Sequence, residues 1–247
     1  MSADKWCETF NELEAKKRTA KADCSMCKGK GIIAVPIEEN GNVYIGARLC
    51  SCTGGTRNER RAERSGLGDL LRRYTFDNYE TERPWQHKAK IKAKGYVKND
   101  DDGWFVMTGK PGSGKTHLCA AICGELLGNG KSVVYMPWRE IAPKLKAMVT
   151  DYKEYDRAMW RYMNAEILYI DDFFKGNVTE ADVNLAYEIL NKRYMNSKSE
   201  ARTIISSEKS LGEITSIDEA IGSRIAERCV GYWIDTPPEN HRLKARG

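Results

Sequence analysis

Eight consecutive residues combine the types and the spacing that bind phosphate. Residues 109–116 are Gly-Lys-Pro-Gly-Ser-Gly-Lys-Thr and match the pattern G-x-x-x-x-G-K-[ST] at every required position. The glycines let backbone N–H groups point at phosphate oxygens, Lys115 reaches the β- and γ-phosphates, and Thr116 places its hydroxyl on Mg²⁺. The pattern predicts a site for ATP and Mg²⁺, with the nucleotide bound by Gly109, Lys110, Pro111, Gly112, Ser113, Gly114, Lys115, Thr116 and His117.

Two carboxylates supply a second half for this site. The apolar run "AEILYIDDFF" ends in Asp171 and Asp172, and a strand that runs into a protein core has little use for adjacent acids. At the carboxyl end of a parallel strand, acids face the ligand crevice instead. We therefore expect Asp171 to hold Mg²⁺ together with Thr116, and Asp172 to polarise the attacking water. The alternative is a solvated turn at the end of the strand.

The elements that must position these residues follow an alternating pattern. Short apolar runs at residues 103–109, 131–136, 165–172, 201–207 and 231–235 are separated by helix-length segments, such as 115–127 and 179–195. Apolar strands that alternate with helices are typical of a parallel sheet with helices on both faces. The sequence therefore predicts an α/β fold, with the phosphate loop between the first strand and its helix.

Four cysteines form two close pairs in the first part of the chain, and these are Cys24, Cys27, Cys50 and Cys52. Between the pairs, Asn40-Gly41 is a strong hairpin-turn signal that would return the second pair to the first. Four thiolates at the base of a hairpin favour a tetrahedral Zn²⁺ site in a zinc-ribbon-like module. The second pair is C-x-C rather than the commoner C-x-x-C, and disulfides or redox chemistry remain alternatives.

The composition of the chain indicates three segments and limits the classes of protein to which it can belong. We expect an N-terminal helix and zinc module in residues 1–55, an arginine-rich linker in 56–73 and the α/β domain in 74–247. The 41% hydrophobic content can fill a core, and the net charge of +5 permits contact with a nucleic-acid backbone without requiring it. The charged N-terminus and the lack of an apolar run of about 20 residues predict a soluble, cytoplasmic protein with no membrane partner.

The order of these motifs resembles a known family. The phosphate loop, the "IDD" strand, the polar strand end in "TIISSEKS" and the "SRI" helix are similar to the AAA+ helicase loaders of the DnaC/DnaI type, bacterial or phage-encoded. "YTFDNYE" and "GKTHL" resemble the same branch, which includes the transposition helper IstB, and the resemblance covers most of residues 70–235.

The resemblance also implies roles for single residues. Arg224 matches the arginine finger that reaches the γ-phosphate held by a neighbouring subunit, whereas its spacing alone favours a salt bridge within its own helix. At the polar strand end, Glu208 stands where these loaders carry a sensing asparagine. An ionised acid cannot donate a hydrogen bond to phosphate, so Ser207 is expected to take part in nucleotide binding instead.

The function that the resemblance implies is ATP-dependent loading of a replicative, DnaB-type hexameric helicase onto DNA by a homo-oligomer. The N-terminal module would dock on the helicase, and single-stranded DNA would be a further partner. An IstB-like transposition helper, a small-molecule kinase and a zinc-dependent DNA-binding regulator remain alternatives. Residues 151–163 mix aromatic with basic side chains, a pattern that suits single-stranded DNA and an amphipathic helix equally.

Overall fold

The computed structural model describes residues 24–27, 32–39, 42–49, 65–99, 103–196 and 201–237. The chain forms two compact units, Met1–Arg60 and Arg61–Gly247, and the division between them falls inside the expected linker. No helix in the described ranges is both long and apolar enough to span a bilayer.

The smaller unit contains an antiparallel hairpin of β1 (Ile32–Glu39) and β2 (Asn42–Leu49). Their register runs from Ile32 opposite Leu49 to Glu39 opposite Asn42, so the two strands of the predicted hairpin are confirmed. Cys24 is half-buried and Cys27 is buried. Cys50 and Cys52 lie outside the described residues, so the zinc site stays a prediction.

The larger unit is built on a five-stranded parallel sheet, and the predicted fold class is confirmed. Its strand order is β4-β5-β6-β3-β7, and every neighbouring pair is parallel. Each of the five apolar runs supplies one strand: β3 (Phe105–Thr108), β4 (Val133–Pro137), β5 (Ile167–Asp171), β6 (Arg202–Ser207) and β7 (Trp233–Asp235).

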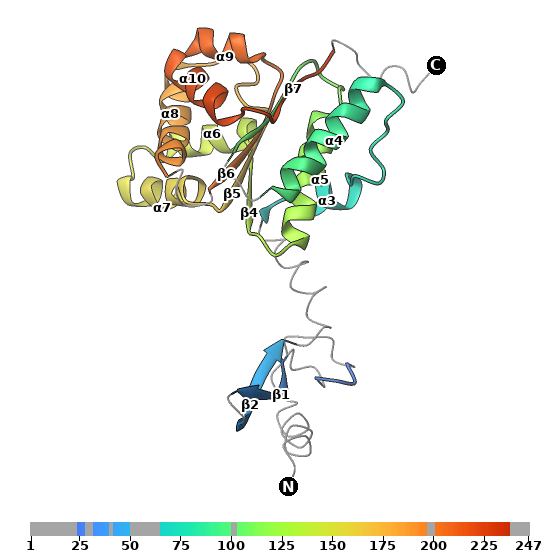
Figure 1. Cartoon of the computed structure of the whole chain (residues 1–247). Helices are drawn as coiled ribbons and strands as arrows, with labels where there is room; N and C mark the ends of the chain where they lie inside the picture. The colour runs from blue at the N-terminus through green and yellow to red at the C-terminus, as the bar shows by residue number, and fades with distance from the viewer. Residues whose placement is uncertain are drawn as a thin grey trace. The chain divides into compact units, whose positions relative to one another are not determined.

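Helices cover both faces of this sheet (Figure 1). One face carries α3 (Gly68–Arg73), α4 (Pro84–Lys98) and α5 (Lys115–Gly128). The other face carries α6 (Trp138–Ala147), α7 (Tyr152–Met163), α8 (Glu180–Met195), α9 (Leu211–Ile217) and α10 (Glu219–Arg228). Because both faces are covered, the strands read as continuous apolar runs rather than alternating ones.

Alternate side chains of the central strands enter two separate cores. In β3, Phe105 and Met107 pack with α4 and α5, whereas Val106 packs in the core on the opposite face. In β5, Tyr169 belongs to the first core and Ile170 to the second. This alternation follows from the two-residue period of a strand, and each fully buried side chain of this size contributes roughly 1.5–3 kcal/mol. The two cores hold the carboxyl ends of the strands in fixed register.

The segment 151–163 forms an amphipathic helix, which is one of the two interpretations that its sequence allows. Asp151 caps α7 by accepting a hydrogen bond from the backbone of Glu154. Met159 and Tyr162 are buried in the core, whereas Tyr152 and Trp160 are 77% and 66% exposed. The helix therefore satisfies the core and still presents two aromatic rings to solvent.

The helix that carries Arg224 lies unusually close to its neighbour. Asp218 caps α10 by accepting from the Ile221 backbone, and α10 then packs on α9 at Gly222. A Cβ at Gly222 would overlap the Thr215 side chain and lie 2.6 Å from the Thr215 Cα. A backbone atom cannot rotate away, so this close approach requires glycine.

We predict that Gly222→Ala lowers the free energy of unfolding by about 1–3 kcal/mol, because the added methyl group forces α9 and α10 apart. The matched control is Gly212→Ala in α9, where a Cβ would meet nothing within 4 Å. That exposed change should be neutral or stabilise the chain by up to about 1 kcal/mol. Chemical denaturation of both variants checks this, and equal stability of the two would contradict it.

Candidate functional site

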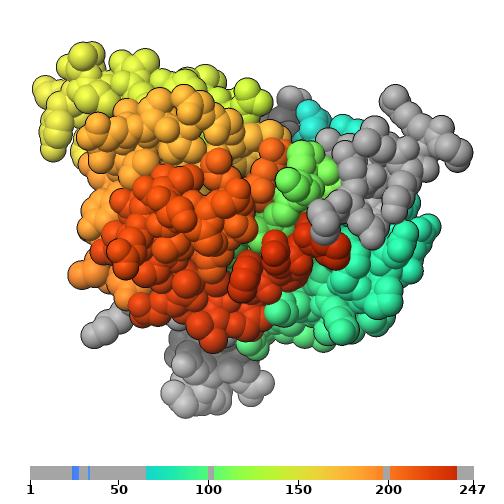
Figure 2. Space-filling view, turned by 90° about the horizontal axis from the view of Figure 1, so that it is seen from above, coloured from blue at the N-terminus to red at the C-terminus, as the bar shows by residue number. Residues whose placement is uncertain are grey.

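The phosphate loop joins β3 to α5 and depends on left-handed glycines. Gly109, Gly112 and Gly114 have φ angles of 129°, 78° and 87°, a region that other residues rarely adopt. At Gly109 a Cβ would also overlap the hydroxyl of Thr236. The loop ends where α5 begins, so the unpaired N–H groups of the first turn face the same side as the loop. Figure 2 shows that a green part of the chain, the colour of the residues around this loop, reaches the surface between the orange-red C-terminal segments and the turquoise segments that precede β3.

Lys115 lies inside the loop. Its side chain is largely buried, and Nζ donates to the backbone carbonyls of Gly109 at 2.7 Å and Lys110 at 2.9 Å. Burial lowers the pKa of Lys115, while the charges of Glu208 and Asp172 oppose this shift. The Ser113 hydroxyl is also buried and has no hydrogen-bond partner among the described residues. The buried ammonium group of Lys115 and the buried hydroxyl of Ser113 are suited to donate hydrogen bonds to the oxygens of a bound phosphate chain.

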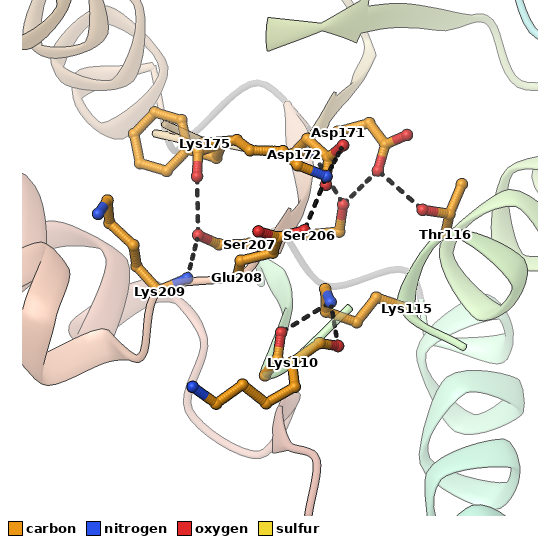
Figure 3. Close-up of polar contacts among 12 residues, drawn as sticks. Lys110, Lys115, Thr116, Asp171, Asp172, Lys175, Ser206, Ser207, Glu208 and Lys209 are labelled. Carbon is orange, nitrogen blue, oxygen red and sulfur yellow. Dashed lines mark hydrogen bonds and ion pairs between the residues drawn. The ribbon is translucent and has the colours of Figure 1, made fainter. Parts of the chain in front are cut away.

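Asp171 ends β5 and accepts hydrogen bonds from four hydroxyl groups, of which those of Thr116 and Ser206 are seen in Figure 3. Its Oδ1 accepts from Thr116 at 3.2 Å, from Tyr169 at 2.8 Å and from Ser206, and its Oδ2 accepts from Tyr135 at 2.9 Å. These bonds explain how a carboxylate that is only 7% exposed is stable there. The strand end thus brings the carboxylate to the Thr116 hydroxyl, and oxygen ligands of this kind suit Mg²⁺.

Asp172 follows in a left-handed conformation, with a φ angle of 55°. Its Oδ2 accepts from Lys175 Nζ at 3.0 Å, and the same ammonium group lies 2.7 Å from Oε1 of Glu208. These three side chains line a pocket of about 370 Å³ together with Lys115 and the loop. A pocket of this size is in the range of small-molecule sites.

Ser207 points elsewhere. Its buried hydroxyl donates to the carbonyl of Phe173 at 2.7 Å and accepts from the backbone N–H of Lys209 at 3.1 Å. Glu208, and not Ser207, is among the residues that line the pocket. The expected contact of Ser207 with nucleotide stays a prediction, and the bond to Phe173 would have to break for it to form.

The segment "YTFDNYE" closes the other side of the pocket. His117 Nε2 lies 3.0 Å from the Thr75 carbonyl and 2.9 Å from Asn78 Oδ1, so two acceptors assign the hydrogen to this nitrogen. Burial lowers the pKa of His117, which favours the neutral ring. The ring of Tyr74 lies 4.8 Å from the His117 ring, centroid to centroid, and both residues line the pocket.

Sequence reasoning missed two of the residues in this pocket, Tyr74 and Lys175. Tyr74 was used only as part of a family resemblance, within "YTFDNYE", and the segment carries no chemical motif of its own. Lys175 is a single lysine in a turn, without periodicity or partner spacing. The only available signal was that Lys175 follows the acidic pair at a strand end.

Arg224 lies outside the pocket of its own chain. From α10 its guanidinium donates to Asn191 Oδ1 at 3.1 Å and to the Ala220 carbonyl at 2.8 Å. The same group lies over the rings of Tyr187 and Tyr194, at 5.1 and 5.5 Å from their centroids. Among the described residues its partners are this amide, this carbonyl and these two rings, and both interpretations of Arg224 stay predictions.

Comparison with known sequences identifies the family. The sequence profile described as "IstB-like ATP binding protein" matches residues 55–246, well over half of the chain. The chain belongs to this family. Family membership supports ATP as the nucleotide for the site between the phosphate loop and Asp171.

Individual relatives of this IstB-like chain agree with the resemblance found in its motifs. The phage-like element PBSX protein XkdC of Bacillus subtilis is 30% identical, over 93% of this chain and 90% of the relative. The replicative helicase loader DnaC of Escherichia coli K12 is also 30% identical, over 76% of this chain and 77% of the relative. The crystal structure of DnaI shares the fold, with a TM-score of 0.56, 20% identity, and coverage of 70% of this chain and 93% of that one.

The contact between Thr116 and Asp171 generates a metal prediction. We expect Thr116→Ala to lower the affinity for ATP about tenfold in Mg²⁺, because one oxygen ligand is lost. The affinity measured in EDTA should not change, and Thr116→Ser, which keeps the hydroxyl, should bind like the parent chain. Fluorescence titration with a labelled ATP analogue checks this. An equal loss with and without Mg²⁺ would contradict it.

Proposed function

We propose that this chain hydrolyses ATP in an assembly of identical subunits, and that this activity loads a replicative hexameric helicase onto DNA. The observation that carries the ATPase part is that Lys115 and Thr116 line one pocket, with the Asp171 carboxylate bound to the Thr116 hydroxyl behind it. The loader part is supported by the 30% identity with the E. coli loader DnaC over three quarters of both chains.

The residues of the pocket divide the work of phosphate chemistry. Lys115 would exchange its two loop carbonyls for β- and γ-phosphate oxygens, since both sets of acceptors lie within reach of one flexible ammonium group. Thr116 and Asp171 would hold Mg²⁺, which neutralises the negative charge of the phosphates. Asp172, at the rim of the same pocket, would orient and polarise the attacking water.

Arg224 would complete the site of a neighbouring subunit. It is held between α10 and α8 by Asn191 and Tyr187, and the pocket of its own chain is lined by other residues. An arginine supplied in trans is worth 10³–10⁵ in rate in related phosphate-loop enzymes, or about 4–7 kcal/mol of transition-state stabilisation. The rate of ATP hydrolysis would then depend on whether the subunits have assembled.

The surfaces outside the pocket would serve the partners. The exposed rings of Tyr152 and Trp160 lie on α7 beside the exposed Arg161, and this combination suits single-stranded DNA. Stacking of one base on an aromatic ring contributes about 1–3 kcal/mol. The N-terminal unit, with Zn²⁺ bound by Cys24, Cys27, Cys50 and Cys52, would dock on the helicase, and metal analysis of the purified chain tests the zinc part.

A transposition helper is the second candidate, because the matching family profile carries the IstB name. It would use the same ATP site and differ in its partner. A metabolite kinase would also use Lys115 and Asp171, but it gives Arg224 no role in trans. The number of subunits that make one active site therefore separates the kinase from both other candidates.

Mixing two inactive variants tests the composite site. Lys115→Ala should lose ATP binding, and Arg224→Ala should keep near-normal affinity while losing turnover. Each variant lacks a different half of the site, so mixed interfaces should regain hydrolysis to a sizeable fraction of the parent rate, measured by phosphate release.

The control mixture contains Asp172→Asn in place of Arg224→Ala, and Asp172→Asn is also expected to bind ATP and turn over slowly. In the pocket of Asp172→Asn the water-polarising group is missing, and in that of Lys115→Ala the nucleotide is missing, so this mixture should stay inactive. Absence of rescue in the first mixture would sink the assignment of Arg224 in trans.

A further inference from the structure

The turn that follows Asp171 is strained and pinned in place. Asp172 and Phe174 both have φ angles of 55°, a conformation that is rare for a bulky residue such as Phe174. The rings of Phe173 and Phe174 are fully buried, stack with centroids 4.0 Å apart, and pack edge-on against Trp138. Strain of this kind persists only where the surrounding packing over-determines the conformation.

This turn directs Lys175 at the phosphate pocket. Lys175 follows Phe174 directly, so the two buried rings fix the point from which its side chain extends. Its Nζ lies between Asp172 Oδ2, at 3.0 Å, and Glu208 Oε1, at 2.7 Å, and the residue lines the same pocket as Lys115 (Figure 3). Burial lowers the pKa of Lys175, but the hydrogen bonds to Glu208 and Asp172 outweigh it, and the net shift is upward. The ammonium group of Lys175 is therefore a positive charge held in place by two carboxylates.

The position of Glu208 makes this cation necessary. Glu208 directly follows Ser207, the last residue of β6, and lines the pocket, where an ionised carboxylate would repel a phosphate. In the structure that carboxylate is paired with Lys175, which converts an acidic position into one that presents a donor to the pocket. Lys115 and Lys175 line the same pocket, and Lys175 is bonded there to both of the acids that line it, Asp172 and Glu208.

We propose that Lys175 binds the γ-phosphate of ATP, that Glu208 positions it, and that this exchange releases Asp172. The inference rests on the proposed ATPase function and deepens it. Without a γ-phosphate, Lys175 stays on Asp172 and occupies the carboxylate that should polarise water. With a γ-phosphate, Lys175 keeps Glu208, exchanges Asp172 for a phosphate oxygen, and leaves Asp172 available. The pair therefore discriminates ATP from ADP.

The direct test is nucleotide affinity rather than turnover. Lys175→Met should bind a non-hydrolysable ATP analogue at least about tenfold more weakly than the parent chain, while its affinity for ADP stays unchanged. The matched control is Lys88→Met, which removes the same charge from an exposed position on α4 and should change neither affinity. Calorimetric titration of each variant with ADP and with the analogue measures both constants. Should Lys175→Met not fold, Lys175→Gln carries the same test with a side chain that can still bond to both acids.

A second pair of variants tests the role of Glu208. Lys175→Arg keeps the cation and should retain most of the preference for the ATP analogue. In a Glu208→Gln background, Lys175→Met should cost less ATP-analogue affinity than in the parent, because Lys175 is no longer held at the pocket. A double-mutant cycle on the ratio of the two nucleotide affinities measures this coupling. Independent, additive effects would overturn the positioning role.

The possible failures are distinguishable. An unchanged ratio of ADP to ATP-analogue affinity in Lys175→Met overturns the inference and leaves the proposed function intact. Equal losses for both nucleotides, together with a lower Tm, would show a structural role only and also overturn it. Failure of the parent chain to bind either nucleotide removes the proposed function itself.

Discussion

The nucleotide-binding half of this molecule depends on one buried carboxylate and the hydroxyl groups around it. Asp171 is held by Tyr135 from β4, Tyr169 from β5, Ser206 at the end of β6 and Thr116 from α5. A carboxylate with so little exposure is stable only when it is well hydrogen-bonded, so the parallel register of three strands and the start of one helix must all be correct. The same register brings together the oxygens of Thr116 and Asp171 that are proposed to hold Mg²⁺. The strand register that stabilises the buried carboxylate is therefore the same register that assembles the site.

Much of this arrangement was predictable from the sequence, for identifiable reasons. The five apolar runs predicted the strands because both sheet faces are covered, and the loop glycines predicted a curled phosphate loop, in which the structure has left-handed backbone at Gly109, Gly112 and Gly114. The remainder depends on contacts between distant segments. The bond from Ser207 to the Phe173 carbonyl and the direction of the Lys175 side chain both depend on the strained turn after β5, which the packing of Phe173 and Phe174 helps to stabilise. The bonds of His117 to the segment before α4 are equally non-local.

The structure also separates the site from the surfaces that would use its energy. Arg224 on α10 and the exposed rings of α7 lie on elements that cover one face of the sheet, and none of them lines the pocket in the described ranges. α10 packs on α9 through Gly222, so a shift of α9 would move Arg224 with it. An assembly in which each chain contributes a pocket and a finger converts nucleotide state into subunit contact, and this is the form of coupling that loading a ring requires.

In the function proposed for this chain, ATP serves to place a helicase on DNA. The most direct measurement is unwinding of a forked substrate, coated with single-stranded-DNA-binding protein, by the replicative helicase of the chain's own host. We expect this chain to stimulate unwinding with ATP, Lys115→Ala not to do so, and the helicase to raise the rate of ATP hydrolysis. If unwinding does not change when the chain is added, and the rate of ATP hydrolysis does not change when the helicase is added, the chain is not a helicase loader.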